Sequence, residues 1–153
     1  MEVRTWLELD QAAIANNYRL LKDRLRPDCL VMGIVKSNAY GHGLVDFSQQ
    51  LVQLGVNWLG VDSITEGLAL RRAGISQPIL ILGYTLPNLL VQARQSNCSV
   101  TISSWDNLRA WAALPADQRP AVHLKLDTGM TRQGFMEQEW STVFDFWQQQ
   151  AGE

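Results

Sequence analysis

The 153-residue sequence has few of the residues that build metal sites or disulfides. It has two cysteines, Cys29 and Cys98, and two histidines, His42 and His123. None of the four has the spacing of metal ligands, so we expect no bound metal. No apolar run approaches the ~20 residues of a membrane helix. The first residues also lack the basic-then-apolar form of a signal peptide. These absences favour a cytoplasmic protein without a membrane span.

The chain also lacks a large excess of charge of either sign. The chain carries 13 Lys and Arg against 15 Asp and Glu, for a net charge of −2. We find no basic cluster with interleaved aromatic residues, so we expect no nucleic-acid partner. A composition of 46% hydrophobic and 18% charged residues is typical of a globular protein rather than a disordered one.

Motifs of several large enzyme classes are missing. The sequence has no GxSxG elbow, which argues against a serine hydrolase. It has no GxGxxG after its first strand and no GxxxxGK[ST], which argues against dinucleotide and P-loop nucleotide sites.

Short apolar runs alternate with helical patterns along the chain. Most runs are apolar on both faces and rich in Val, Ile and Leu, as buried parallel strands are. They lie at residues 29–35, 58–61, 79–82, 100–102 and 122–126, and residues 6–9 are a further candidate. Strands alternating with helices predict βαβ units and a parallel sheet.

The segments between these runs have helical periodicity with recognisable ends. Asp10 is a candidate N-cap, and Ser63 and Glu66 have the spacing of a capping box. The first helix carries an apolar stripe of Ile14, Tyr18, Leu21 and Leu25. Further helices are predicted at residues 44–54, 87–95, 104–114 and 137–150. The last of them carries Trp140, Phe144 and Trp147 at helical spacing, and we expect these aromatic residues to pack in the core.

About five βα units fit into the chain. Such a pattern is compatible with an open doubly wound sheet and with part of a (β/α)8 barrel. A complete barrel needs ~250 residues, so this chain is too short for one. In both architectures, functional groups gather at the carboxyl ends of the strands.

Lys36 ends the strand predicted at residues 29–35. Strand alternation places it on the same face as Met32 and Ile34, which predicts a position at the end of a buried face. Lysine normally emerges into solvent, but here a loop rich in glycine and polar residues follows. A helix begins after Gly43, and its free N–H groups could face an anion such as phosphate.

A second polar segment follows the strand predicted at residues 122–126. Alternation places His123, Lys125 and Asp127 on the face opposite the apolar residues. In a barrel this polar face points into the lumen, although an edge strand with one solvated face has the same pattern. Arg132 follows in a glycine-containing loop, and its planar guanidinium suits a phenolate or a carboxylate.

These two segments together resemble the alanine racemase family. VKSNAYGHG at residues 35–43 is similar to the family's lysine motif VKANAYGHG, and DTGMTRQGF at residues 127–135 is similar to DTGMxRxGF. TWLELD at residues 5–10 also fits the family's first strand, and Ser37 and Gln133 are mild departures. The resemblance implies an α/β fold: an incomplete parallel (β/α) barrel of the TIM type, with about five of eight units. Residues 1–153 would be the N-terminal portion of that domain, and the family's C-terminal β domain would be absent.

The resemblance also implies a cofactor and a reaction. The cofactor is pyridoxal 5′-phosphate (PLP), and the reaction interconverts L-alanine and D-alanine, supplying D-alanine for peptidoglycan. Lys36 would hold PLP as a Schiff base and act as one catalytic base. Tyr40 would bind the cofactor phosphate, and Arg132 the phenolic oxygen and the substrate carboxylate. Lys125 matches a lysine that is carbamylated in some members, where it positions the arginine.

Racemisation needs two bases, one on each face of the planar reacting centre. In the family the second base is a tyrosine from the β domain of a partner subunit. We therefore expect a homodimer for the full-length protein and little activity for this chain alone, as a fragment. A serine or broad-specificity racemase of the same family remains an alternative, and so does a non-catalytic PLP carrier.

Overall fold

The computed structural model describes residues 4–151 of the chain. Its sheet has the strand order β1-β2-β3-β4-β5, and every neighbouring pair is parallel. The strands are β1 (Met32–Ile34), β2 (Trp58–Val61), β3 (Ile79–Ile81), β4 (Cys98–Ile102) and β5 (Val122–Leu124). The parallel sheet predicted from the sequence is confirmed. The prediction of a further candidate strand at residues 6–9 is wrong, because that segment makes no strand pairing.

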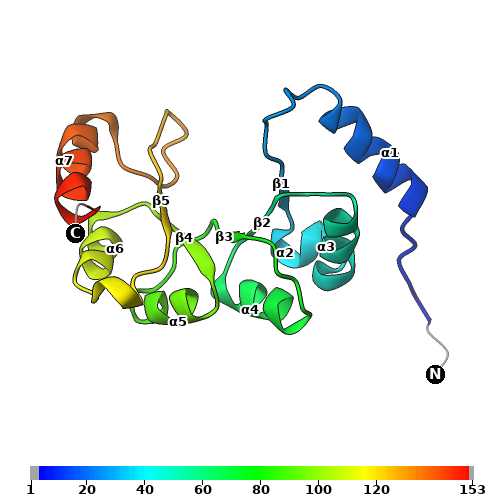
Figure 1. The fold of residues 1–153 in the computed structure, drawn as a ribbon, viewed down its shortest axis with the longest axis horizontal. Helices are drawn as coiled ribbons and strands as arrows, with labels where there is room; N and C mark the ends of the chain where they lie inside the picture. Colours follow the sequence, from blue (N-terminus) through cyan, green and yellow to red (C-terminus); the bar gives the residue numbers. More distant parts are fainter. Residues whose placement is uncertain (1–3, 152–153) are drawn as a thin grey trace.

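Helices follow the strands in a regular order along the chain. They are α1 (Gln11–Lys22), α2 (Lys36–Tyr40), α3 (Leu44–Gln53), α4 (Ile64–Arg72), α5 (Leu90–Gln95), α6 (Trp105–Ala112) and α7 (Trp140–Ala151), with 3-10 turns η1 (Pro87–Leu89), η2 (Ala116–Gln118) and η3 (Glu137–Glu139). Figure 1 shows the strands as a row, with α3 to α6 along one side and α1 and α7 at the two ends. Among residues 4–151, no helix has the length and apolar character needed to cross a bilayer.

One face of the sheet packs against the helices. Residues paired across parallel strands share a face, and the register joins Gly33 to Leu59, Leu59 to Ile79 and Ile79 to Cys98. Leu59 and Ile79 are fully buried on this face. A side chain at Gly33 would press on Leu51 of α3, so glycine there allows the helix to approach the strand. The hydrophobic core therefore lies between the sheet and α3 to α6.

The opposite face carries Lys36, and the sequence prediction for it needs correction. Ile34, on the same face as Lys36, is 39% exposed, whereas Val35 on the helix-covered face is 0% exposed. Lys36 thus ends the less buried face of β1, because no helix covers that side among the described residues. Gly60 lies on the same face, and a Cβ there would contact Ile34, so the apolar side chains pack sideways over this glycine.

Among the α-helices of the described residues, α1 is the one without a buried residue. Asp10 is its N-cap, as predicted, and its Oδ1 accepts from the N–H groups of Ala12 at 2.8 Å and Ala13 at 3.0 Å. The expected apolar stripe is only half-buried, however, because Leu21 is 67% exposed and Leu25 lies beyond the helix. A mostly apolar cavity of about 460 Å³ remains between α1, β1 and α3.

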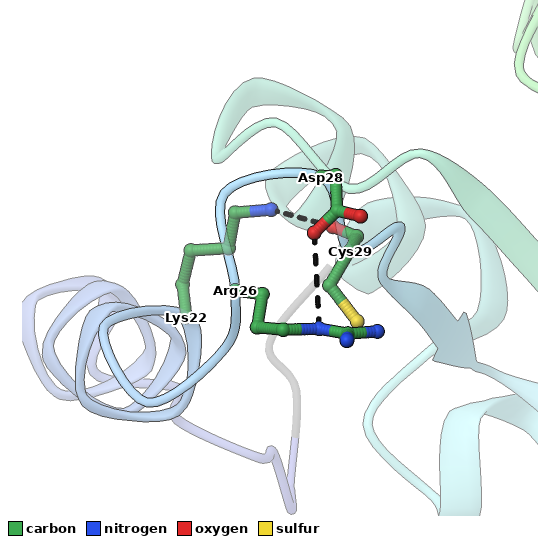
Figure 2. Close-up of polar contacts among 4 residues, drawn as sticks. All are labelled: Lys22, Arg26, Asp28 and Cys29. Carbon is green, nitrogen blue, oxygen red and sulfur yellow. Dashed lines mark hydrogen bonds and ion pairs between the residues drawn. The ribbon is translucent and has the colours of Figure 1, made fainter.

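The segment from α1 to β1 is held by polar contacts. Lys22 Nζ donates to the carbonyl of Cys29 at 3.1 Å, and Arg26 pairs with Asp28 at 3.8 Å, as Figure 2 shows. The ion pair is highly exposed, so it contributes little to stability. The lysine contact joins the end of α1 to the segment that precedes β1.

The aromatic residues of α7 divide between core and surface. Trp147 stacks on Trp111 of α6, with ring centroids 4.8 Å apart. Trp140 is half-buried, and its Nε1 donates to the carbonyl of Phe135 at 2.9 Å. Phe144 is 41% exposed, so the prediction of core packing holds for the two tryptophans and is wrong for this residue.

Candidate functional site

A cavity of about 380 Å³ lies at the carboxyl ends of the strands. Its lining includes residues at or near the end of each strand and two from the loop after β5, namely Lys36, Asp62, Leu82, Gly83, Thr101, Lys125, Arg132 and Gln133. The cavity thus brings together three residues that were predicted from two distant segments of the sequence: Lys36, Lys125 and Arg132. The volume lies within the range of small-molecule sites.

Strand register explains why these side chains meet. Ile34 pairs with Gly60, and Thr101 pairs with His123, so both pairs lie on the open face of the sheet. Residues two positions further along each strand keep that face. Lys36, Asp62 and Lys125 are those residues, and they therefore point to the same side of the sheet near its carboxyl edge.

The chain turns left-handed directly after Lys36. Ser37, Asn38, Ala39 and Tyr40 have φ between 52° and 56°, a region that residues other than glycine seldom occupy. Such a conformation costs roughly 1–2 kcal/mol per residue. Helix α2 is therefore a left-handed turn, and Lys36 lies at the junction between this turn and β1.

Asn38 makes the hydrogen bonds that close this turn. Its carbonyl accepts from the N–H groups of Gly41 and Gly43, both at 3.0 Å. Its Oδ1 accepts from the N–H of Leu44 at 2.9 Å, at the first residue of α3. The expectation that the start of α3 faces a phosphate finds no support here, since Asn38 occupies its first N–H group and no residue of α3 lines the cavity.

Tyr40 does not line the cavity. Its side chain is 62% exposed, and it ends the left-handed turn. The resemblance implied that Tyr40 contacts a cofactor phosphate. The position of Tyr40 in the structure does not test that contact, which stays a prediction.

Arg132 lies on a loop closed at its base by backbone hydrogen bonds. Asp127 N–H donates to the carbonyl of Phe135 at 2.8 Å, and Phe135 N–H donates to the carbonyl of Lys125 at 2.9 Å. Gly134 has φ of 124°, and a Cβ there would lie 2.8 Å from the backbone nitrogen of Asp127. The loop can close this tightly only with glycine at that position.

The Asp127 carboxylate organises the loop from inside. Its Oδ1 accepts from Gly129 N–H at 2.8 Å and from Thr131 N–H at 3.0 Å. The pKa of Asp127 lies below its ordinary value of 3.8, mainly because of the N–H groups of Thr131 and Gly129. Desolvation opposes this shift, whereas the N–H of Met130 and the charge of Lys125 add smaller effects that also lower the pKa. Asp127 therefore supports the loop of Arg132 and is not part of the cavity lining.

Sequence reasoning missed Asp62, Thr101 and Gln133. Asp62 follows a correctly predicted strand, so inspection of every strand end would have found it. Thr101 lies inside an apolar run and gives no such signal; it is 5% exposed, and its Oγ1 has no hydrogen-bond partner among the described residues. Gln133 donates from Nε2 to the carbonyl of Leu82 at 3.3 Å.

The charges of the lining favour an anionic ligand. Lys36, Lys125 and Arg132 are cationic, and Asp62 is the one acidic side chain among the lining residues of this cavity. Like charges in a partly enclosed space create a field that attracts ions of opposite sign. The cavity therefore suits a molecule with phosphate or carboxylate groups.

Comparison with known proteins gives matches over most of the chain. A family model described as "Alanine racemase, N-terminal domain" matches residues 9–152. The chain is 38% identical over 136 residues to an alanine racemase of Methylacidiphilum infernorum, covering 87% of this chain and 35% of that protein. It is 40% identical over 136 residues to an alanine racemase of Nostoc sp., covering 86% and 35%. The chain thus spans little more than a third of the length of these relatives.

Solved structures agree with the sequence matches. An alanine racemase from Bacillus anthracis with bound L-Ala-P superposes with a TM-score of 0.88 at 31% identity, covering 99% of this chain and 39% of that one. An alanine racemase from Oenococcus oeni gives a TM-score of 0.82 at 33% identity, covering 92% and 39%.

These matches decide between the two parallel architectures. The predicted fold class, an incomplete parallel barrel of the TIM type, is confirmed, because the five-stranded sheet corresponds to part of the barrel of these enzymes. The family model and the curated relatives agree with the structural matches. The chain therefore belongs to the alanine racemase family, and its residues 9–152 match the model of that family's N-terminal domain.

Proposed function

We propose that this chain provides the lysine half of the active site of a PLP-dependent alanine racemase. The observation that carries the proposal is the convergence of Lys36, Lys125 and Arg132 in one cavity at the carboxyl edge of the sheet. The alanine racemases that match the chain support the choice of reaction. Supply of D-alanine for peptidoglycan is part of the same proposal.

The side chains of the cavity fit PLP. A half-buried lysine amine supplies the group that binds the cofactor covalently. The guanidinium of Arg132 suits the phenolic oxygen and a substrate carboxylate, and Lys125 in its unmodified form adds a second cation. The buried hydroxyl of Thr101, which has no partner among the described residues, adds a polar group that a ligand could satisfy. When bound, PLP supplies the electron sink that stabilises a carbanion at the substrate α-carbon.

Each proposed role follows from the chemistry of the side chain. Lys36 would hold the cofactor through Nζ and, once released, exchange the α-proton on one face of the substrate. Arg132 would bind the substrate carboxylate and the phenolic oxygen with its planar fork. Lys125, if carbamylated, would present an anion to that guanidinium. Tyr40 would bind the phosphate through its phenol.

The second base would come from elsewhere. Inversion of a carbon centre needs proton donors and acceptors on both faces, and Lys36 serves one face only. We propose that a C-terminal β domain of a partner subunit provides the tyrosine for the other face. Residues 1–153 would then be the N-terminal portion of a barrel domain in a homodimer.

Covalent labelling with PLP tests the proposal, because the chain has only three lysines that the label could mark: Lys22, Lys36 and Lys125. The 153-residue chain is mixed with PLP, reduced with borohydride and mapped by peptide mass spectrometry. We expect the label on Lys36 and loss of the visible PLP band in Lys36→Ala. Lys22→Ala, which alters the remote lysine at the end of α1, is the matched control and should keep both. Equal labelling of Lys22 and Lys36, or a band that survives Lys36→Ala, would refute the proposal.

A further inference from the structure

The left-handed turn after Lys36 needs support from outside its own residues. Four successive residues from Ser37 to Tyr40 occupy the left-handed region without a glycine among them. Strained backbone of this kind persists only where surrounding structure holds it. The hydrogen bonds of Asn38 described above are internal to the segment from β1 to the start of α3. They do not tie the turn to the rest of the sheet.

Glu66 provides a tie of that kind. Its Oε2 accepts from the N–H of Asp62 at 2.7 Å, and its Oε1 accepts from the N–H of Asn38 at 3.4 Å. Asp62 directly follows β2, and Asn38 lies two residues after Lys36. One half-buried carboxylate thus bridges the backbones that follow two neighbouring strands.

This arrangement differs from the capping box that the sequence predicts. Ser63 Oγ accepts from Glu66 N–H at 3.4 Å, which is the expected half of the box. In the other half, Glu66 would accept from the N–H of Ser63. The carboxylate instead reaches past its own helix to Asp62 and Asn38. Its hydrogen bonds therefore lie at the edge of the cavity, and Asp62 is one of the residues that line it.

We propose that Glu66 is a positioning residue of the site: it holds the left-handed turn in place and thereby keeps Lys36 at the cavity. The 2.7 Å bond from Asp62 N–H is a short charge-assisted hydrogen bond that fixes the position of the carboxylate, and the 3.4 Å contact from Asn38 N–H is a longer and weaker one. The role of Lys36 toward PLP rests on the proposed function, whereas the effect of Glu66 on the turn does not.

Glu66→Gln tests this inference with minimal change in size. The amide keeps one acceptor oxygen and places an NH2 group against a backbone N–H, so one of the two contacts is lost. In the cofactor-free 153-residue chain, we expect amide hydrogen exchange at residues 37–41 to become faster by about tenfold, as the loss of one such bond predicts. Acetylation of Lys36 relative to Lys22, measured by mass spectrometry, should rise, and PLP labelling of Lys36 should fall.

Glu139→Gln is the matched control. Glu139 also bridges two donors, with Oε2 accepting from Met136 N–H at 2.8 Å and Oε1 accepting from Trp105 Nε1 at 2.8 Å, away from the cavity lining. It should lower the melting temperature without changing exchange at residues 37–41 or the reactivity of Lys36. If Glu66→Gln fails to fold, Glu66→Asp keeps the charge but is one methylene too short to span both N–H groups.

The possible outcomes separate this inference from the proposed function. Unchanged exchange at residues 37–41 in Glu66→Gln would overturn it, and so would faster exchange with unchanged reactivity of Lys36. Should the unsubstituted chain take up no PLP at Lys36, the proposed function fails. Exchange and acetylation, which need no cofactor, then still decide the role of Glu66.

Discussion

At the level of single residues, the cavity depends on side chains that lie far apart in the sequence. Lys36 and Arg132 were predicted from their motifs, and Lys125 from strand alternation, and the structure places all three in one lining. The role of Tyr40 came from the resemblance, and its exposed position does not follow from any local pattern. Thr101 was not predicted, because alternation places it opposite Val100 and Ile102 but does not show which residues of other strands lie beside it.

Asp127 provides a prediction about pH. Its pKa is lower in the folded chain than in the unfolded one, so the charged form stabilises the loop above the unfolded pKa of about 4. That contribution is lost as the pH falls through the lower, folded pKa. In an NMR titration from about pH 6 downward, we expect the amide signals of Gly129 and Thr131 to shift only below about pH 4.

Asp127→Asn is the control for this titration. The amide oxygen can still accept the same hydrogen bonds, but it carries no charge to lose. The amide shifts of Gly129 and Thr131 should then show no transition in that range. A transition above about pH 4 in the unsubstituted chain would contradict the lowered pKa.

At the level of elements, the strands were predictable and the left-handed turn was not. Runs of Val, Ile and Leu identify buried strands wherever they occur, and β2 (Trp58–Val61) has the predicted bounds. Residues 37–40 are Ser, Asn, Ala and Tyr, and local preferences do not favour left-handed backbone for such a run. One contact with the turn comes from Glu66 on another helix, and Ala39 of the turn packs in the hydrophobic core. Helix α1 illustrates the converse, because its apolar stripe indicated a buried face that the described residues cover only in part.

The loop that carries Arg132 provides a prediction at this scale. Gly134→Ala should lower the free energy of unfolding by about 2–3 kcal/mol, because it adds both an unfavourable φ and a clash with the backbone of Asp127. Gly129→Ala is matched in φ, which is 124° at both positions, but its Cβ would contact nothing within 4 Å. It should cost only about 1 kcal/mol. Chemical denaturation measures both, and equal losses would contradict a role for the close approach at Gly134.

At the level of the whole molecule, the alternation of strands and helices was enough to predict a parallel sheet. It was not enough to distinguish a barrel from an open sheet, because both contain the same βα units. The solved alanine racemases made that distinction, and this chain corresponds to about two-fifths of them.

The two-base requirement leads to a prediction for activity. The 153-residue chain supplied with PLP should interconvert L-alanine and D-alanine at no more than a small fraction of the rate of a complete racemase, because Lys36 serves one face of the substrate. Chiral chromatography of alanine after incubation measures the rate, and Lys36→Ala provides the background. Turnover close to that of a complete enzyme would contradict the proposed division of the two bases between domains.

The strand order β1-β2-β3-β4-β5 has a consequence for how the chain folds. Each strand pairs with the one that precedes it in the sequence, so no pairing has to wait for a distant segment. Paired residues in neighbouring strands lie 19 to 26 positions apart in the sequence, so each closure involves one βα unit and none spans the whole chain. The sheet can therefore grow by one βα unit at a time while the polypeptide leaves the ribosome, with each finished strand serving as the template for the next.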